Sequence, residues 1–157
     1  MHEQIAFRTA YAVTHNATDA EDVTQEAFLK AHRALSRFRR GAPFRPWLLR
    51  IVGNEARNRV RSRSRRDRIA TAVAADPVAS GGAAPPPEAD VVAAESRREL
   101  FAAVDRLPPD ERLAIVGRYF LGLSDEEAAA ALGVRRGAVK MRVFRALERL
   151  RHELEER

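Results

Sequence analysis

Apolar side chains recur with helical spacing through most of the 157-residue chain. Because an α-helix completes a turn about every 3.6 residues, this spacing gathers the apolar residues of each segment on one face. No segment alternates apolar and polar residues as a strand would, and the sequence has no Asn-Gly or Asp-Gly hairpin turn. We therefore expect an all-α fold. The predicted helices cover residues 4–14, 18–37, 46–63, 97–107, 110–120, 125–132 and 136–155.

A segment rich in Ala, Pro and Gly separates the third and fourth predicted helices. Residues 70–94 contain no Lys or Arg, and Gly81-Gly82 and Pro85-Pro86-Pro87 interrupt any helix there. This composition predicts a flexible linker between two small helical domains, residues 1–69 and 95–157. Because 29 of the hydrophobic residues are alanine, we expect small helical units rather than one large core.

The composition excludes several classes of site. The chain has no cysteine, so disulfides, thiolate zinc sites and cysteine nucleophiles are absent from it. The histidines show no metal-ligand spacing, and neither a metal site nor a cofactor site is expected. No apolar stretch is long enough to span a bilayer, and the first residues do not resemble a secretion signal. A cytoplasmic protein without membrane insertion is therefore expected.

Positive charge is concentrated in one part of the chain. The formal net charge is +6, yet residues 37–68 alone contain 12 arginines and two acidic residues, a net charge of +10. Of the 28 basic residues in the chain, only Lys30 and Lys140 are lysines. Arginine suits bidentate contacts with phosphates and bases, but a GC-rich coding sequence produces the same bias. The composition leaves both explanations open.

The second predicted helix has an apolar residue on its polar face. The residues Ala20, Val23, Ala27, Ala31, Ala34 and Leu35 form the apolar face, and Thr18 with Glu21 predicts a capping box at its start. Leu29 lies on the opposite side, among Asp22, Gln25 and Glu26. An isolated surface leucine needs no explanation, whereas an apolar residue surrounded by carboxylates is typical of a protein-docking face. The spacing allows both interpretations.

The third predicted helix carries a stripe of basic and amide side chains. Arg50, Asn54, Arg57 and Arg61 recur one or two turns apart, Trp47 and Asn58 flank them, and Arg39, Arg40 and Phe44 precede the helix. Arginine contacts phosphates, asparagine hydrogen-bonds base edges, and aromatic rings stack on unpaired bases. The stripe therefore predicts binding to single-stranded or melted nucleic acid. Trp47 fits the helix core equally well.

The last two predicted helices form a helix-turn-helix. Ser124 and Glu127 predict a capping box, Gly133 predicts the turn, and the apolar face of the last helix consists of Val139, Val143 and Leu147. Basic residues near the start of a second such helix are typical of recognition in the major groove of duplex DNA. The predicted contacts are Arg136, Lys140, Met141, Arg142 and Arg145.

These motifs resemble those of bacterial sigma factors. Residues 19–29, DAEDVTQEAFL, resemble the polymerase-docking helix, and residues 44–54, FRPWLLRIVGN, resemble the promoter-melting segment that follows it. The motif at residues 107–112, LPPDER, and the helix-turn-helix resemble the C-terminal domain of the same proteins. Their order and the short chain are similar to the extracytoplasmic-function (ECF) group of the sigma-70 family.

The resemblance implies a role for each motif. Residues Asp22, Gln25, Glu26 and Leu29 would dock on the clamp of the largest subunit of core RNA polymerase, and the C-terminal domain would contact its flap. The loop at residues 39–45 would capture a flipped base of the minus-10 element, and Asn54, Arg57, Asn58 and Arg61 would contact the melted strand. The last helix would bind the minus-35 element, and the acidic linker would enter the RNA exit channel.

Three further expectations accompany the resemblance. The first predicted helix is about two or three turns shorter than is usual in the family, which leaves open whether the start of the chain is truncated. Arg135 occupies a position where relatives often have a Ser or Thr cap, which predicts a weak cap. Control by a separate anti-sigma protein is expected.

Three other functions compete with this interpretation. They are a free-standing helix-turn-helix regulator, a metal-dependent nuclease using Asp22 and Glu26, and a general RNA-binding protein. A free-standing regulator needs neither the stripe of the third predicted helix with Trp47 nor the polar face around Leu29. The sigma-factor interpretation, without catalytic activity of the chain itself, is therefore the one we expect to hold.

Overall fold

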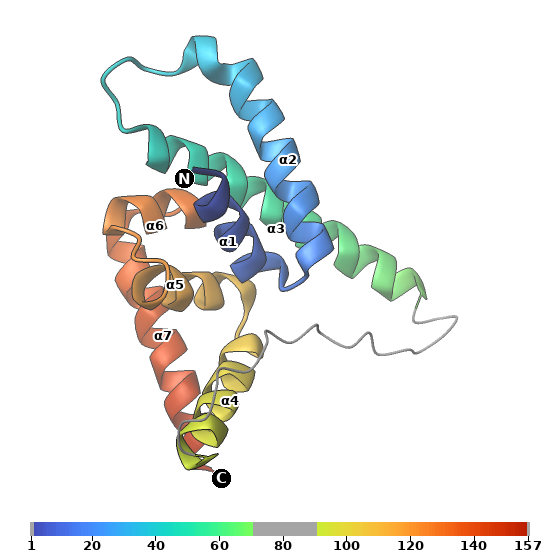
Figure 1. Ribbon diagram of the computed structural model, residues 1–157, viewed down its shortest axis with the longest axis vertical. Coiled ribbons are helices and arrows are strands. Elements are labelled where there is room, and N and C mark those ends of the chain that lie inside the picture. The colour runs from blue at the N-terminus through green and yellow to red at the C-terminus, as the bar shows by residue number, and fades with distance from the viewer. Residues whose placement is uncertain (1, 71–90, 157) are drawn as a thin grey trace.

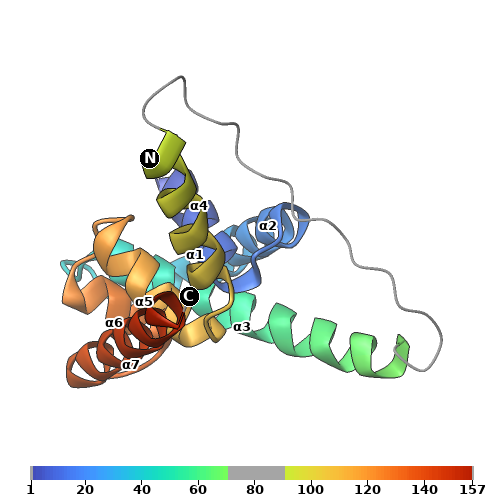
Figure 2. The same cartoon turned by 90° about the horizontal axis from the view of Figure 1, so that it is seen from below.

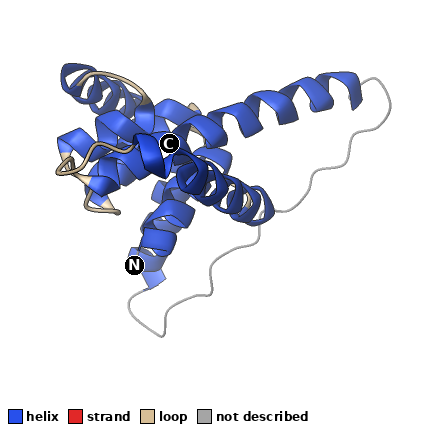
Figure 3. Cartoon of the chain, turned by 90° about the horizontal axis from the view of Figure 1, so that it is seen from above, coloured by secondary structure: helices blue, strands red, loops and turns tan. Residues whose placement is uncertain are grey.

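The computed structural model describes residues 2–70 and 91–156, and these two ranges contain helices and turns but no strand (Figures 1 and 3). Most of the predicted linker, residues 71–90, lies outside the described residues. None of the described helices is long and apolar enough to cross a membrane. The helices are α1 (His2–Thr14), α2 (Ala17–Ala34), the 3-10 helix η1 (Leu35–Arg37), α3 (Phe44–Ala70), α4 (Val91–Asp105), α5 (Pro109–Tyr119), α6 (Asp125–Leu132) and α7 (Arg136–Glu155).

Helix boundaries match the predictions best in the helix-turn-helix, where α6 and α7 begin and end at the predicted residues. Helix α3 continues seven residues beyond the predicted end, and its C-terminal half projects from the body of the protein (Figure 2). Its arginine-rich sequence contains no helix breaker, so the helix continues into solvent. Helix α4 begins at Val91, so residues 91–94 are helical although the composition placed them in the linker.

The start of α2 differs from the prediction. Asn16, not Thr18, is the N-cap, and its side chain accepts a hydrogen bond from the Asp19 backbone N–H at 2.9 Å. His15 adopts a positive φ of 52°, which turns the chain sharply out of α1 and lets α2 begin immediately. The predicted capping box of Thr18 and Glu21 is therefore wrong.

The capping box of α6 is confirmed. The Glu127 backbone N–H donates to the Ser124 hydroxyl at 3.1 Å, and the Ser124 N–H donates to the Glu127 carboxylate at 3.4 Å. Gly133 follows the helix in the left-handed conformation, with a φ of 67°. The structure thus contains both signals that the sequence indicated for α6, the capping box at its start and the left-handed glycine at its end.

Replacing Ser124 with Ala is expected to destabilise the protein by about 1 kcal/mol, because the first turn of α6 loses its side-chain acceptor. Chemical denaturation monitored by circular dichroism measures this difference. Ser124→Thr is the matched control, since threonine retains the hydroxyl oxygen. Equal stability of Ser124→Ala and the wild-type protein would contradict this role of the cap.

The first three helices pack together through small side chains. Ala20, Val23, Ala27 and Ala31 of α2 are buried as predicted, facing α1 and α3. Leu35 was expected on the same face, but it is 51% exposed because α2 ends at Ala34 and the chain changes direction in η1. The buried residues of α3 are Leu48, Leu49, Val52, Gly53 and Ala56.

In the C-terminal half, α7 packs along α4 and α5. Val139 is buried and Val143 is half-buried, as predicted, but Leu147 is 44% exposed. Ala146 and Leu150 are buried instead, because successive steps of four, three and four residues from Val139 remain on one face of a helix. The predicted inward orientation of Leu147 is therefore wrong.

One apolar core extends across both halves, contrary to the expectation of small separate cores, and a second, smaller core lies within the C-terminal half. The larger cluster of buried residues includes Val52 of α3, Leu113 of α5 and Leu132 of α6. Small residues allow this close packing: a Cβ atom added to Gly53 would lie 1.8 Å from the carbonyl oxygen of Ala131. The backbones of α3 and α6 are consequently in direct contact, a feature that hydrophobic periodicity within one helix does not reveal.

Candidate protein and nucleic-acid interfaces

The four predicted docking residues lie together. Asp22, Gln25, Glu26 and Leu29 of α2 line one surface groove, whose other wall is formed by Glu55, Asn58, Arg59 and Ser62 of α3. Leu29 is 51% exposed, as its position on the polar face predicted. Asn58 was predicted to contact DNA, and the structure places it in the groove beside the α2 residues. The groove combines an apolar residue with a ring of polar and charged ones.

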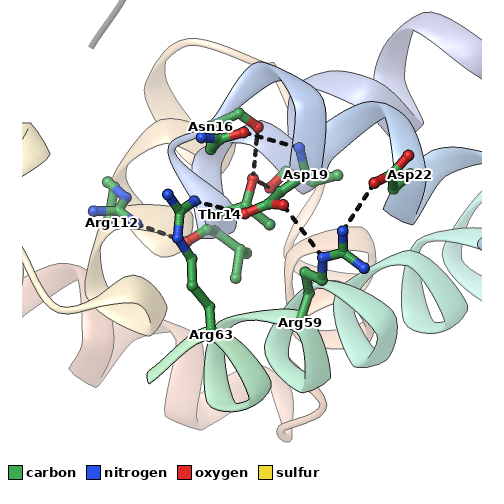
Figure 4. A network of polar contacts seen from close by, with 9 residues as sticks. Thr14, Asn16, Asp19, Asp22, Arg59, Arg63 and Arg112 are labelled. Carbon is green, nitrogen blue, oxygen red and sulfur yellow. Dashed lines mark hydrogen bonds and ion pairs between the residues drawn. The ribbon is translucent and has the colours of Figure 1, made fainter. Parts of the chain in front are cut away.

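Ion pairs fix the two walls of the groove relative to each other. Arg59 contacts Asp22 at 2.8 Å and Asp19 at 3.3 Å, and Arg63 contacts Asp19 at 2.7 Å (Figure 4). Lys30 also pairs with Glu55 across the groove. Arg59 and Arg63 were not predicted as site residues. Their spacing of one helical turn places them on the same face of α3, which could have indicated a shared partner.

The carboxylates of the groove do not form a metal centre in the described part of the chain. Asp22 pairs with Arg59, and no group of three or more His, Asp or Glu side chains is arranged to hold a metal ion within residues 2–70 and 91–156. The arrangement suits a protein surface, where a fixed apolar anchor is surrounded by charges that select the partner.

The basic stripe of α3 is only partly exposed. Arg50, Asn54 and Arg61 are exposed, whereas Arg57 is half-buried. The guanidinium of Arg57 donates to the Ala131 carbonyl oxygen and to the Asn54 side-chain oxygen, each at 2.6 Å. Burial lowers the pKa of Arg57, nearby Asp110 raises it, and Arg61 and Arg142 lower it. An arginine remains protonated after such a shift, so Arg57 is a partly desolvated cation.

Aromatic side chains form a cluster at the start of α3. The ring of Trp47 lies 4.9 Å from that of Phe38 and 5.5 Å from that of Phe44, measured between centroids. Trp47 is half-buried and packs against the core, so it has both a structural contact and an accessible part. Arg39 and Arg40 are exposed in the turn that leads to this cluster. Cationic and aromatic groups therefore lie together at the entrance of the helix, as predicted.

The start of α7 presents an open basic surface. Arg136, Lys140, Met141 and Arg145 are exposed, although Arg136 pairs with Glu126 at 3.3 Å. Arg142 is different, because it is half-buried and donates to Asp110 at 3.0 Å. Its side chain is thus engaged within the C-terminal half. Arg135 is the N-cap and makes no side-chain capping bond, as its type predicted.

Together these features define a class of protein. A helix-turn-helix, a second basic surface and a separate groove around an exposed leucine place the chain in the class of helical DNA-binding factors.

The chain belongs to the ECF group of the sigma-70 family and is an alternative sigma factor of RNA polymerase. Residues 1–66 match the family described as Sigma-70 region 2, and residues 97–150 match Sigma-70 region 4. The chain is 39% identical over 142 residues to the ECF RNA polymerase sigma-E factor of Escherichia coli strain K12, covering 87% of this chain and 74% of that protein. It is 38% identical over 139 residues to the RNA polymerase sigma-H factor of Pseudomonas aeruginosa, covering 85% and 72%.

Solved structures agree with this assignment. The sigma factor RpoE of Bartonella quintana, in complex with the anti-sigma factor NepR, aligns with a TM-score of 0.74 and 28% identity, covering 98% of this chain and 92% of that one. CnrH in complex with the cytosolic domain of CnrY aligns with a TM-score of 0.64 and 28% identity, covering 99% and 83%.

Proposed function

We propose that this sigma factor uses three surfaces: the α2–α3 groove for core RNA polymerase, the α3 stripe for the melted minus-10 element, and the start of α7 for the minus-35 element. The observation that carries the proposal is the convergence of Asp22, Gln25, Glu26 and Leu29 on one groove next to a basic helix. Residues 1–69 would perform docking and melting, and residues 95–157 would bind the minus-35 duplex, with the linker between them.

The groove suits the clamp of the largest polymerase subunit. Leu29 would enter an apolar contact, while Asp22 and Glu26 would pair with basic side chains at its edge. Gln25 would add hydrogen bonds. The ion pairs of Arg59 would keep the groove preformed, so that little ordering is needed on binding.

The α3 stripe suits a single strand. Arg50, Arg57 and Arg61 would contact phosphates, and Asn54 would reach a base edge or the sugar. Arg39, Arg40, Phe44 and Trp47, at the entrance of α3, would hold an extruded base by stacking and by charge. Asn58 would act at the border between strand and polymerase, since it lines the docking groove.

Replacing Lys140 with Ala is expected to weaken minus-35 recognition and to spare polymerase binding. Lys140 is exposed at the start of α7, where it would contact a phosphate or a base edge in the major groove. We expect binding to a promoter duplex to weaken by about 1–3 kcal/mol, measured by fluorescence anisotropy. An equally large decrease in affinity for core polymerase would contradict the division of labour between the two halves.

An anti-sigma factor is the expected regulatory partner. One of the similar solved structures shows a sigma factor in complex with the anti-sigma factor NepR. Pull-down of the tagged protein from its native cells, followed by mass spectrometry, tests this partner. A pull-down that contains polymerase and lacks any anti-sigma protein would count against it.

The remaining proposals follow from the family. The chain would have no catalytic activity and no cofactor of its own, and it would act in the cytoplasm, on the nucleoid when bound to polymerase. A free-standing helix-turn-helix regulator is the disfavoured alternative, because it has no use for the α2–α3 groove. Reconstitution with core polymerase tests the main proposal: promoter-specific transcription supports it, and DNA binding without any effect on polymerase would contradict it.

A further inference from the structure

Two ion pairs join the first turn of α5 to α7. Arg142 donates a hydrogen bond to the carboxylate of Asp110 at 3.0 Å, and Arg149 pairs with Glu111 at 2.8 Å. Because a helix completes a turn about every 3.6 residues, Arg142 and Arg149 lie two turns apart on the same side of α7. This side faces α5, which packs against α7 (Figure 1). Charged groups therefore hold α7 at two points along its length.

The partners of these ion pairs are partly withdrawn from solvent. Asp110 and Arg142 are half-buried, and the side chain of Glu111 is 9% exposed. Both carboxylates belong to the first turn of α5, where the positive end of the helix favours them. Charge-assisted hydrogen bonds between groups held in this way have a defined geometry, unlike ion pairs between freely moving surface side chains.

The apolar contacts of α7 define its rotation less strictly. Its buried residues are Val139, Ala146 and Leu150, and the first two have short side chains. Short side chains fix the distance between two helices, but they offer little resistance to a rotation of one helix about its axis. Arg142 follows Lys140 by two residues, or about 200° around the helix. A rotation of α7 that breaks the contact with Asp110 therefore also redirects Lys140.

We propose that Asp110 is a positioning residue for recognition of the minus-35 element: it holds Arg142, and through Arg142 it sets the rotation of α7. Arg142 is then a positioning residue as well, and not a DNA contact. The inference rests on the proposed role of α7. It changes the assignment made from the sequence, where a basic residue near the start of the last helix was placed among the DNA contacts. Glu111 and Arg149 provide a second point of attachment farther along the helix.

Charge alone predicts the opposite effect of Asp110 on DNA binding. The carboxylate lies in the half of the chain that would bind the duplex, so its removal raises the net charge and favours binding to any DNA. The positioning role predicts weaker binding to a recognised sequence, because misdirected side chains of α7 lose their contacts with base edges. The sign of the change therefore distinguishes the two effects.

Asp110→Asn tests the positioning role. The probe is a labelled duplex that the full-length wild-type protein enriches from a randomised pool, and the unselected pool is the reference for non-specific binding. We expect about tenfold weaker binding to the enriched duplex, equivalent to the loss of about one base contact, and equal or tighter binding to the unselected pool. Unchanged or tighter binding to the enriched duplex would overturn the inference.

Glu99→Gln is the matched control. It removes the same charge from an exposed position on α4, which lies outside the contact between α5 and α7. It should keep the wild-type preference for the enriched duplex. An equal loss of preference in Glu99→Gln and Asp110→Asn would show an effect of total charge and would contradict the positioning role.

Arg142→Gln removes the same ion pair from the other side and decides the matter if Asp110→Asn does not fold. Asp110 then remains in the first turn of α5, where a carboxylate is favourable, so this variant should retain its helical circular dichroism. We expect weaker binding to the enriched duplex and an unchanged salt dependence on the unselected pool. If Arg142 contacted a phosphate, the logarithmic salt slope would decrease by about 0.9, and that result would overturn the inference.

Exchanging the two charges provides the final test. The double variant Asp110→Arg, Arg142→Asp can form the ion pair again in reverse, and it should prefer the enriched duplex more strongly than either single variant does. If Arg142 were a DNA contact, an aspartate there would repel the phosphates and no recovery would be seen. A wild-type protein that enriches no duplex from the pool would instead contradict the proposed function of α7 itself.

Discussion

Leu29→Asp is expected to abolish binding to core RNA polymerase without unfolding the protein. Leu29 is 51% exposed, so a charge there is solvated in the free protein and costs little stability. In the complex the same carboxylate would be buried without a partner in the centre of an apolar contact, which costs at least about 2 kcal/mol, or about 30-fold in affinity. Anisotropy of the labelled protein titrated with core polymerase measures the decrease in affinity.

Leu35→Asp is the matched control. Leu35 is also 51% exposed and lies in η1 directly after α2, but it does not line the docking groove. It should bind polymerase like the wild-type protein. Similar decreases in affinity for both variants, or weaker helical circular dichroism in Leu29→Asp, would contradict the specific role of the groove.

Arg61→Glu is expected to block promoter melting while leaving polymerase binding intact. Arg61 is exposed on the α3 stripe, and glutamate would replace attraction for a strand phosphate with repulsion. We expect at least about a tenfold decrease in permanganate-reactive thymines in the polymerase–promoter complex. This decrease corresponds to a loss of roughly 1.4 kcal/mol or more in the free energy that stabilises the melted strand. Strand binding should also become less sensitive to salt, by about 0.7 in the logarithmic slope for each phosphate that the protein no longer neutralises.

Arg98→Glu provides the comparison for Arg61→Glu. Arg98 is 73% exposed on α4, away from the stripe, and its replacement changes the net charge by the same amount. Melting should be unaffected in this variant. If both substitutions reduced melting equally, the effect would come from total charge and the assignment of the stripe would be wrong.

Local signals in the sequence were sufficient for much of the fold and of the site. Ser124 and Gly133 mark the ends of α6 because a capping hydroxyl and a left-handed glycine act on their own helix. The exposure of Leu29 follows from helical periodicity alone. In each case the determining interaction spans only a few residues.

The features that the sequence did not predict depend on distant contacts. Arg112 donates to carbonyls 99 and 100 residues away, and no local pattern indicates such a partner. The half-burial of Arg57 arises in the same way, since its helical position alone predicted a solvent-facing cation. The apolar residues of α7 can be grouped into more than one stripe along the helix, so periodicity alone predicted that Leu147 faces inward. Packing against α4 and α5 determines which of these stripes is buried.

Run-off transcription sequencing on fragmented genomic DNA from the source organism tests the central claim most directly. Core polymerase is assayed alone and with this protein added, and the new transcript starts are aligned. We predict new starts that share two upstream sequence elements, one for each DNA surface. Their absence, both with this chain and with a version extended at the N-terminus, would contradict the proposal that this sigma factor directs polymerase through these surfaces.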